Sequence, residues 1–189
     1  HVDILRGVNE QNSNYFKKYN SNLKIYNFPA WIDNSIFSLE RSETRKDLLF
    51  VGNIIKRKGV YFLIDSLATF LTENQDVQLK IIGKKEDSIY YKKIIDYINE
   101  KKLDERVMFL DEITHIEIAK YMNSSRILLM ASSSEGLPRV LIEAGFCGLP
   151  SIATDIDGIR EPFSLKGGTL IYELNSQKEF MQKVDSLYN

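Results

Sequence analysis

The stretch SSSEGLPRVLIEAGFCGLPSIATDIDGIRE, residues 132–161, decides the fold. The run just before it, RILLMA at residues 126–131, is short and apolar, which predicts a buried strand. Serines, an acid and a glycine follow as a polar loop. Pro138 suits the first turn of a helix because that position has no intrahelical N–H partner to lose. Gly148 then ends the helix, so the stretch predicts strand, tight loop and helix.

Two acids mark this unit. Glu135 falls on the loop, and Glu143 falls about two turns up the helix. The loop's free N–H groups and the positive end of the helix dipole point to where a parallel sheet ends, which favours phosphate. The helix also has an apolar face, formed by Val140, Leu141, Ala144 and Cys147.

Short apolar strands alternate with amphipathic helices along most of the chain. This pattern predicts an α/β fold, a Rossmann-like doubly wound parallel sheet of about six strands with both faces covered. The expected strands are 48–51, 77–82, 107–110, 126–131, 151–154 and 169–172, and a further strand, helix and strand are expected at 2–7, 10–19 and 23–27.

Ligands of such sheets bind beyond the carboxyl ends of the strands. We therefore expect the chemistry in four loops that leave those ends. They are residues 52–59, 83–88, 111–115 and 132–138.

Composition narrows the class of protein. The chain has 189 residues, a net charge of −1 and one cysteine. Nothing in this charge favours a nucleic-acid partner, and a lone cysteine fits a reducing cytoplasm. No apolar run is long enough to cross a bilayer. Because the chain begins at His1, we expect a piece of something longer, or a tag remnant joined to one.

The motifs of residues 132–161 resemble a known family. Read in register, they are similar to the signature of the retaining glycosyltransferases of family four, the group one glycosyl transferases, and the resemblance runs from about Ile25 to the C-terminus. It implies one half of a GT-B enzyme, the C-terminal nucleotide-sugar-binding domain at 41–189, preceded at 1–40 by a remnant of the other domain and the linker. The matching motifs are Glu135-Gly136-Leu137, Leu141-Ile142-Glu143-Ala144, Cys147-Gly148-Leu149-Pro150 and Gly158-Ile159-Arg160-Glu161.

The resemblance implies roles for individual residues. Glu143 would accept hydrogen bonds from the ribose hydroxyls, and Glu135 would lie beside the transferred sugar as a catalytic group. Without the family context, Glu143 reads as an ordinary exposed helix acid, and Glu135 as an acid that favours a helix N-terminus. The sugar and phosphate would also contact Gly136, Leu137, Pro138 and Arg139, and the base would rest near Gly83, Lys84, Glu112 and Ile113.

The first of the four loops, GNIIKRKG at residues 52–59, lacks the spacing of a P-loop or a dinucleotide fingerprint. The family pattern begins with glycine and arginine and ends with lysine and glycine, and its two cations hold the diphosphate. Gly52 and Lys58 match, and Lys58 would be catalytic. Asn53 stands in place of the arginine. Lys56 or Arg57 could compensate, although a solvated loop is the commoner reading for both.

Other candidate residues receive structural interpretations. Asp157 reads as a replacement for a glycine in a turn, His115 as a helix cap or surface residue, and Cys147 as a small core residue. Trp31 reads as a plug at the interdomain hinge, with stacking on a sugar or base as the alternative. No cluster has metal-ligand spacing, so we expect no metal and no cofactor beyond the nucleotide-sugar substrate.

The resulting hypothesis is transfer of a hexose from a UDP- or GDP-sugar to a glycan or lipid-linked acceptor, with retention, as in polysaccharide biosynthesis. The fragment itself would be inactive because the N-terminal acceptor domain is missing. A cytoplasmic enzyme is expected, and peripheral association of the full-length protein with the inner face of the membrane stays open. The alternatives are a non-catalytic nucleotide- or sugar-binding module and a nucleotide-sugar epimerase, against which the paired glutamates argue.

Overall fold

The computed structural model describes residues 4–7, 10–27, 31–40, 45–163 and 168–188. Its main feature is a six-stranded sheet in which every neighbouring pair of strands is parallel, in the order β5-β4-β3-β6-β7-β8. The predicted α/β fold with a parallel six-stranded sheet is confirmed. The strands are β3 (Asp47–Val51), β4 (Leu79–Ile82), β5 (Val107–Leu110), β6 (Ser125–Met130), β7 (Ser151–Thr154) and β8 (Thr169–Tyr172).

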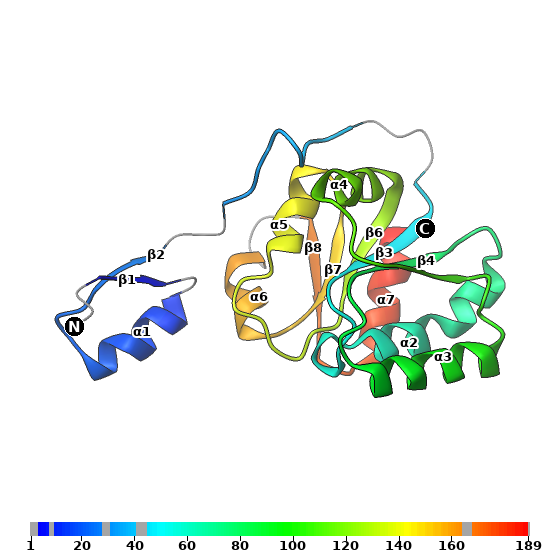
Figure 1. Cartoon of the computed structure of the whole chain (residues 1–189), viewed down its shortest axis with the longest axis horizontal. Helices are drawn as coiled ribbons and strands as arrows, with labels where there is room; N and C mark the ends of the chain where they lie inside the picture. Colours follow the sequence, from blue (N-terminus) through cyan, green and yellow to red (C-terminus); the bar gives the residue numbers. More distant parts are fainter. Residues whose placement is uncertain (1–3, 8–9, 28–30, 41–44, 164–167, 189) are drawn as a thin grey trace.

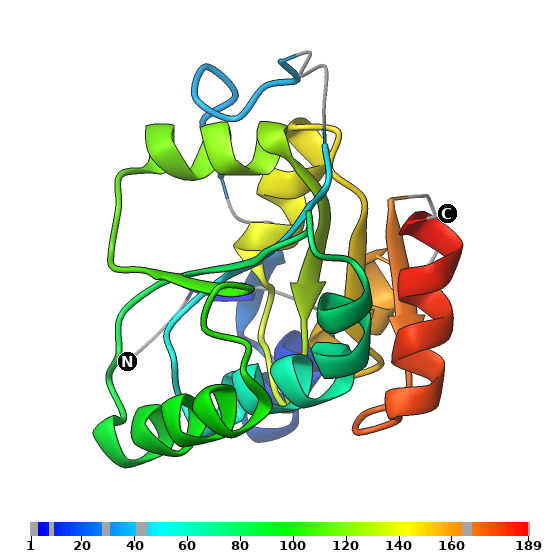
Figure 2. The ribbon, with the colours of Figure 1, turned by 90° about the vertical axis from the view of Figure 1, so that its right-hand side faces the viewer.

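Helices cover both faces of the sheet (Figure 1). One layer consists of α2 (Val60–Glu73), α3 (Ser88–Lys101) and α7 (Gln177–Tyr188), and the other of α4 (His115–Ser124), α5 (Arg139–Phe146) and α6 (Asp157–Phe163). Figure 2 shows the layers from the side, with α4 across the top, α3 along the bottom and the strands between them.

The two layers explain why the strands read as continuous apolar runs. Successive side chains of a strand point to opposite faces. In β3, Leu48 and Phe50 pack into the core under α2, α3 and α7, whereas Leu49 packs into the core under α4, α5 and α6. All three are at most 2% exposed. In a strand buried on both faces most positions are apolar, which is typical of parallel sheets.

The strand order reverses between β3 and β6. After β3 the chain adds β4 and β5 on one side, and after β6 it adds β7 and β8 on the other. In doubly wound folds, ligands bind beyond the carboxyl ends of the strands at such a reversal. This is the position that the fold offers to a ligand.

The N-terminal residues form a unit of their own. This unit consists of strand β1 (Ile4–Gly7), helix α1 (Glu10–Tyr19) and strand β2 (Lys24–Asn27). The two strands pair in parallel as a small sheet that shares no strand with the large one (Figure 1). Trp31 is 77% exposed, so within this chain it is not a buried plug. The neighbouring residues 28–30 lie outside the described residues.

The segment before β3 is anchored to the large sheet's domain. Phe37 is 1% exposed and packs in the same core as Leu49 and Leu141. The Asn123 side chain donates to the Ser38 carbonyl at 3.0 Å and accepts from the Glu40 N–H at 2.8 Å. Residues 37–40 therefore pack on the six-stranded unit, while the domain boundary at residue 40 stays a prediction.

The interpretation of Asp157 as a turn residue is wrong. Asp157 begins the helix α6, which runs to Phe163. Gly158 and Pro162 obscured this short helix, because both residue types have poor helix propensity. Helix α6 nevertheless includes Pro162, and the acid in its first turn, Asp157, suits the helix dipole.

The anchor can be tested by truncation. Phe37→Ala should lower the free energy of unfolding by about 3–5 kcal/mol, because it empties a buried aromatic site. Urea denaturation measures this change. Leu39→Ala is the control, since Leu39 is 63% exposed and its truncation should shift stability by less than about 0.5 kcal/mol. Equal losses in the two variants would contradict the anchoring of this segment.

Candidate functional site

Hydrogen bonds join the four loops predicted to hold the ligand. The Gly83 N–H donates to the Leu110 carbonyl, and the Ile54 N–H donates to the Lys84 carbonyl at 2.8 Å. The Ser133 N–H donates to the Arg57 carbonyl at 2.9 Å. The loops after β5, β4, β3 and β6 thus form one continuous rim at the carboxyl edge of the sheet.

At the centre of the rim, two cations meet one carboxylate. The Lys58 Nζ lies 2.5 Å from Glu135 Oε1, and the Arg57 Nη1 lies 3.3 Å from the same oxygen. Arg57 Nη1 also donates to the Ser134 carbonyl at 2.5 Å. The side chain of Glu135 is only 10% exposed and that of Lys58 18%. The predicted catalytic pair, Lys58 and Glu135, is therefore in direct contact.

A glycine allows this contact. Lys58 ends a short 3-10 helix (Lys56–Lys58), and the next residue, Gly59, has φ 67°. A Cβ at Gly59 would lie 2.2 Å from the carbonyl oxygen of Ala131, at the end of β6. Only a residue without a side chain lets the helix approach β6 this closely, and this approach brings Lys58 to the Glu135 loop.

The same loop is supported from the other side by α6. A Cβ at Gly158 would lie 2.2 Å from the carbonyl oxygen of Glu135 and 2.7 Å from that of Gly136. The first turn of α6 therefore packs directly against the backbone of the Glu135 loop. This contact explains the glycine in the fourth motif of the sequence.

The second acid, Glu143, is buried. It lies on α5, is 7% exposed, and its Oε1 is 3.6 Å from Arg139 Nη2. Burial raises the pKa of Glu143, and the positive charges of Arg139 and His115 oppose that rise. The reading of Glu143 as an ordinary exposed helix acid is wrong.

The other predicted site residues line the rim with different exposure. His115 is exposed at the first position of α4, and the helix cap is the preceding residue, Thr114, whose hydroxyl accepts from the Glu117 N–H. Pro138 caps α5 without a side-chain hydrogen bond. Cys147 is fully buried, and burial raises the pKa of its thiol to about 11, which confirms a core residue.

The exposure of the other predicted binding residues varies along the rim. The half-buried ones are Gly52, Asn53, Ile113 and Leu137, the buried ones are Gly83 and Pro138, and the exposed ones are Lys84, Glu112, Gly136 and Arg139.

The structure also shows an ion pair between two neighbouring loops of the rim that the sequence did not indicate. Lys85 Nζ lies 2.9 Å from Asp111 Oδ1, which ties the loop after β4 to the loop after β5. The hydrogen bond that Lys85 donates to Asp111 raises the pKa of Lys85. No spacing rule could find this pair, because adjacent strand ends bring together residues that are distant in sequence.

Neither Asp155 nor Asp157 presents a free carboxylate for a metal. Arg160 lies 2.5 Å from Asp155 Oδ1 and 3.6 Å from Asp157 Oδ1. In the part of the chain that the structure describes, no group of three or more His, Cys, Asp or Glu side chains could hold a metal ion. No helix in the described ranges is long and apolar enough to cross a membrane.

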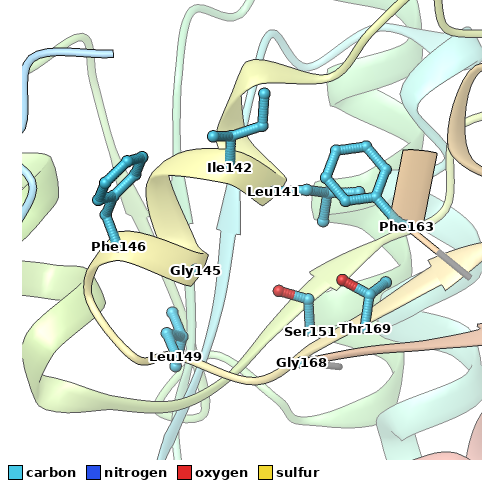
Figure 3. Close-up of a pocket in the computed structure, with 9 residues that line it drawn as sticks. All are labelled: Leu141, Ile142, Gly145, Phe146, Leu149, Ser151, Phe163, Gly168 and Thr169. Carbon is cyan, nitrogen blue, oxygen red and sulfur yellow. The ribbon is translucent and has the colours of Figure 1, made fainter. Parts of the chain in front are cut away.

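An apolar cavity of about 340 Å³ lies elsewhere, at the amino ends of β7 and β8 (Figure 3). Apolar side chains of α5 and Phe163 of α6 form its walls, and the hydroxyls of Ser151 and Thr169 lie between them. None of the described residues that line it is charged. This cavity therefore does not suit a diphosphate and is separate from the rim.

The fold and rim define a class of protein, a doubly wound α/β domain that brings Arg57, Lys58 and Glu135 together at the switch in strand order. The family model of glycosyl transferases group 1 matches residues 32–189. The chain therefore belongs to the group 1 glycosyl transferases.

Two curated relatives illustrate the match. An uncharacterized glycosyltransferase of Methanocaldococcus jannaschii is 31% identical over 141 residues, which is 75% of this chain and 38% of that protein. The N-acetyl-alpha-D-glucosaminyl L-malate synthase of Bacillus anthracis is 31% identical over 120 residues, 64% of this chain and 30% of that protein. The chain thus spans well under half the length of these two relatives.

Solved structures share the fold. Anabaena HepE, solved in complex with UDP and glucose, superposes with a TM-score of 0.82 at 18% identity and covers 97% of this chain, which spans 53% of HepE. The C-terminal domain of LpcC, a glycosyl transferase group 1 family protein from Francisella tularensis, gives a TM-score of 0.73 at 21% identity, covering 83% of this chain and 87% of that domain. The matches identify the GT-B type of architecture.

The burial of Glu143 predicts a pH-dependent effect on stability. Because its pKa is raised in the folded chain, the unfolded state loses the proton first as the pH rises, and the folded state becomes relatively less stable. Glu143→Gln carries no charge at any pH. It should therefore unfold at higher urea than the wild type at pH 7, with an advantage that shrinks toward pH 4.

Urea titrations at several pH values measure this difference. Glu86→Gln is the control, since Glu86 is exposed and its replacement should give no such trend. An advantage of Glu143→Gln that stays constant from pH 4 to pH 7 would show that the lost charge is not its cause.

Proposed function

We propose that this chain is the donor-binding half of a retaining family-four glycosyltransferase, which transfers a hexose from a UDP- or GDP-sugar to a glycan or lipid-linked acceptor. The observation that carries the proposal is the contact of Lys58 and Arg57 with Glu135 at the switch in strand order. The buried Glu143 on the adjoining helix and the UDP bound by the structural neighbour HepE support it.

Glu143 is the residue proposed to hold the ribose. A carboxylate has two acceptor oxygens, which suit the two neighbouring hydroxyls of a ribose. The side chain is held by a helix and is 7% exposed, so its position is fixed before the ligand arrives. A buried carboxylate with an incomplete set of partners gains most from a donor that supplies hydrogen bonds.

Lys58 is the residue proposed to hold the diphosphate. Breaking the bond between sugar and phosphate releases an anionic nucleoside diphosphate, whose charge must be stabilised as it develops. Lys58, the backbone N–H groups near Gly136 and the N-terminus of α5 would do this without a metal. The leaving phosphate would then take the proton of the acceptor, so no protein nucleophile is required.

The base would rest on the loops after β4 and β5. Gly83, Lys84, Glu112 and Ile113 belong to these loops, which the pair of Lys85 and Asp111 holds together. Main-chain groups of the two loops would supply most of the hydrogen bonds. Glu135 would lie beside the transferred sugar, next to the backbone of Gly136 to Arg139.

The acceptor site and part of the active site are proposed to belong to a further domain. The chain spans 38% of the length of its Methanocaldococcus relative, and a domain of LpcC similar to it has been solved as a C-terminal domain. Association of the whole enzyme with the inner face of the membrane is part of this proposal. One observation favours a second candidate, a non-catalytic binding module, because Asn53 carries no charge where the family pattern has arginine.

Nucleotide binding tests the proposed function. The chain should bind one of UDP, GDP and ADP in calorimetry, because the donor rim is present, and should transfer no sugar, because the acceptor wall is absent. A radiolabelled-sugar transfer assay beside the titrations checks the second part. Binding of none of the three diphosphates contradicts the proposal, and efficient transfer by the chain alone contradicts its division between two domains.

Binding of a nucleotide without its sugar should distinguish the proposed roles of Glu143 and Glu135. Glu143→Gln should weaken binding of the bare nucleoside diphosphate about tenfold or more, because a hydrogen bond to a charged group contributes about 1.5–3 kcal/mol. Glu135→Gln should not weaken that affinity, since its proposed sugar partner is absent and its charge only pairs with the cations that the diphosphate would contact. Titration of both variants with the diphosphate that the wild type binds makes the comparison. Equal losses would show that the assigned roles are wrong.

A further inference from the structure

The charges at the centre of the rim do not suit a diphosphate unless Arg57 is included. Lys58 is bonded to Glu135, and these two charges cancel. Asn53, the other polar residue at the start of this loop, contributes no charge. A diphosphate brings at least two negative charges, so a neutral pair would give it little attraction. Arg57, 3.3 Å from Glu135, raises the sum of the three side chains to +1.

We propose that Arg57 is a second phosphate-binding residue of this site, and that Glu135 holds both Arg57 and Lys58 in place until the diphosphate arrives. This inference rests on the proposed function, since it concerns the same donor. It assigns to Arg57 the neutralising charge that Asn53 cannot supply, and it excludes Lys56, the other cation of the loop.

The geometry of Arg57 fits this role. Its side chain is 45% exposed, so a ligand can reach it, whereas that of Lys58 is 18% exposed. The hydrogen bond to the Ser134 carbonyl and the ion pair with Glu135 both involve Nη1. The planar guanidinium presents five N–H donors, and its other edge can meet two phosphate oxygens at once.

Lys56 differs from Arg57 although the two are adjacent. It is exposed, and none of the ion pairs among the described residues includes it. The 3-10 helix turns Arg57 and Lys58, and not Lys56, toward Glu135. Lys56 is therefore a matched control, of the same charge, on the same turn.

Binding of a diphosphate would exchange one anion for another. Glu135 shares a single oxygen between two cations, which leaves each cation free to move to a more highly charged partner. A phosphate in contact with both would satisfy them better than one carboxylate oxygen. Glu135 would then face the sugar with its charge no longer cancelled by Lys58.

Affinities for diphosphates and monophosphates test the role of Arg57. The chain, Arg57→Gln and Lys56→Gln are titrated with UDP and UMP, GDP and GMP, and ADP and AMP. Arg57→Gln should lower the ratio of diphosphate to monophosphate affinity about tenfold or more, as expected for one charged hydrogen bond. Lys56→Gln should leave the ratio within about twofold. The double variant Asn53→Arg/Arg57→Gln should recover part of the loss.

Thermal unfolding and salt dependence separate this role from a structural one. Loss of a phosphate contact should make diphosphate affinity less sensitive to salt in Arg57→Gln than in the wild type. A lower Tm with an unchanged affinity ratio would overturn the proposal, because Arg57 would then only support the Glu135 loop. If the wild type binds none of the diphosphates, the proposed function fails and this inference fails with it. If the wild type binds a diphosphate but Arg57→Gln keeps the affinity ratio as Lys56→Gln does, the inference alone fails.

Discussion

The adjacency of β3 and β6 is the constraint on which the site depends. The chain leaves β3 toward α2 on one face of the sheet and leaves β6 toward α5 on the other, so the two loops lie side by side above the central strands before the chain turns to opposite faces. A crevice at this point is a property of the doubly wound topology and needs no particular side chain. What this sequence adds is charge, because Lys58 and Glu135, 77 residues apart in the chain, meet there at 2.5 Å.

The two acids of the site are accommodated in opposite ways. Glu135 is nearly buried but has two cations beside it, so its charge is largely offset. Glu143 is 7% exposed with one arginine at 3.6 Å, and burial raises its pKa. A buried, weakly paired carboxylate destabilises the fold and is therefore weak evidence for a structural role. The same feature suits a binding residue, because a ligand that brings hydrogen-bond donors recovers the lost interactions.

Most of the fold could be predicted from the sequence, because strands buried on both faces give uninterrupted apolar runs. The strand order could not, since periodicity says nothing about which strands pair. Helix α6 was missed because Asp157 was read as part of a turn. A glycine stands at position 158 because a Cβ there would lie 2.2 Å from the Glu135 carbonyl oxygen. The burial of Glu143 on α5 and the pairing of Arg57 with Glu135 were also missed, because both depend on segments that only the tertiary structure brings together.

On the proposed function, this chain supplies one wall of the donor site, and that wall alone would not support transfer. Lys84, Glu112, Gly136 and Arg139 are exposed within this chain, so a donor bound on the rim would keep one side in water. Water weakens the electrostatic stabilisation of a leaving diphosphate and competes with the acceptor for the sugar. On the proposed function, binding and chemistry therefore depend on different parts of the enzyme. The rim residues of this chain would fix the nucleotide, while the exclusion of water would need a second surface.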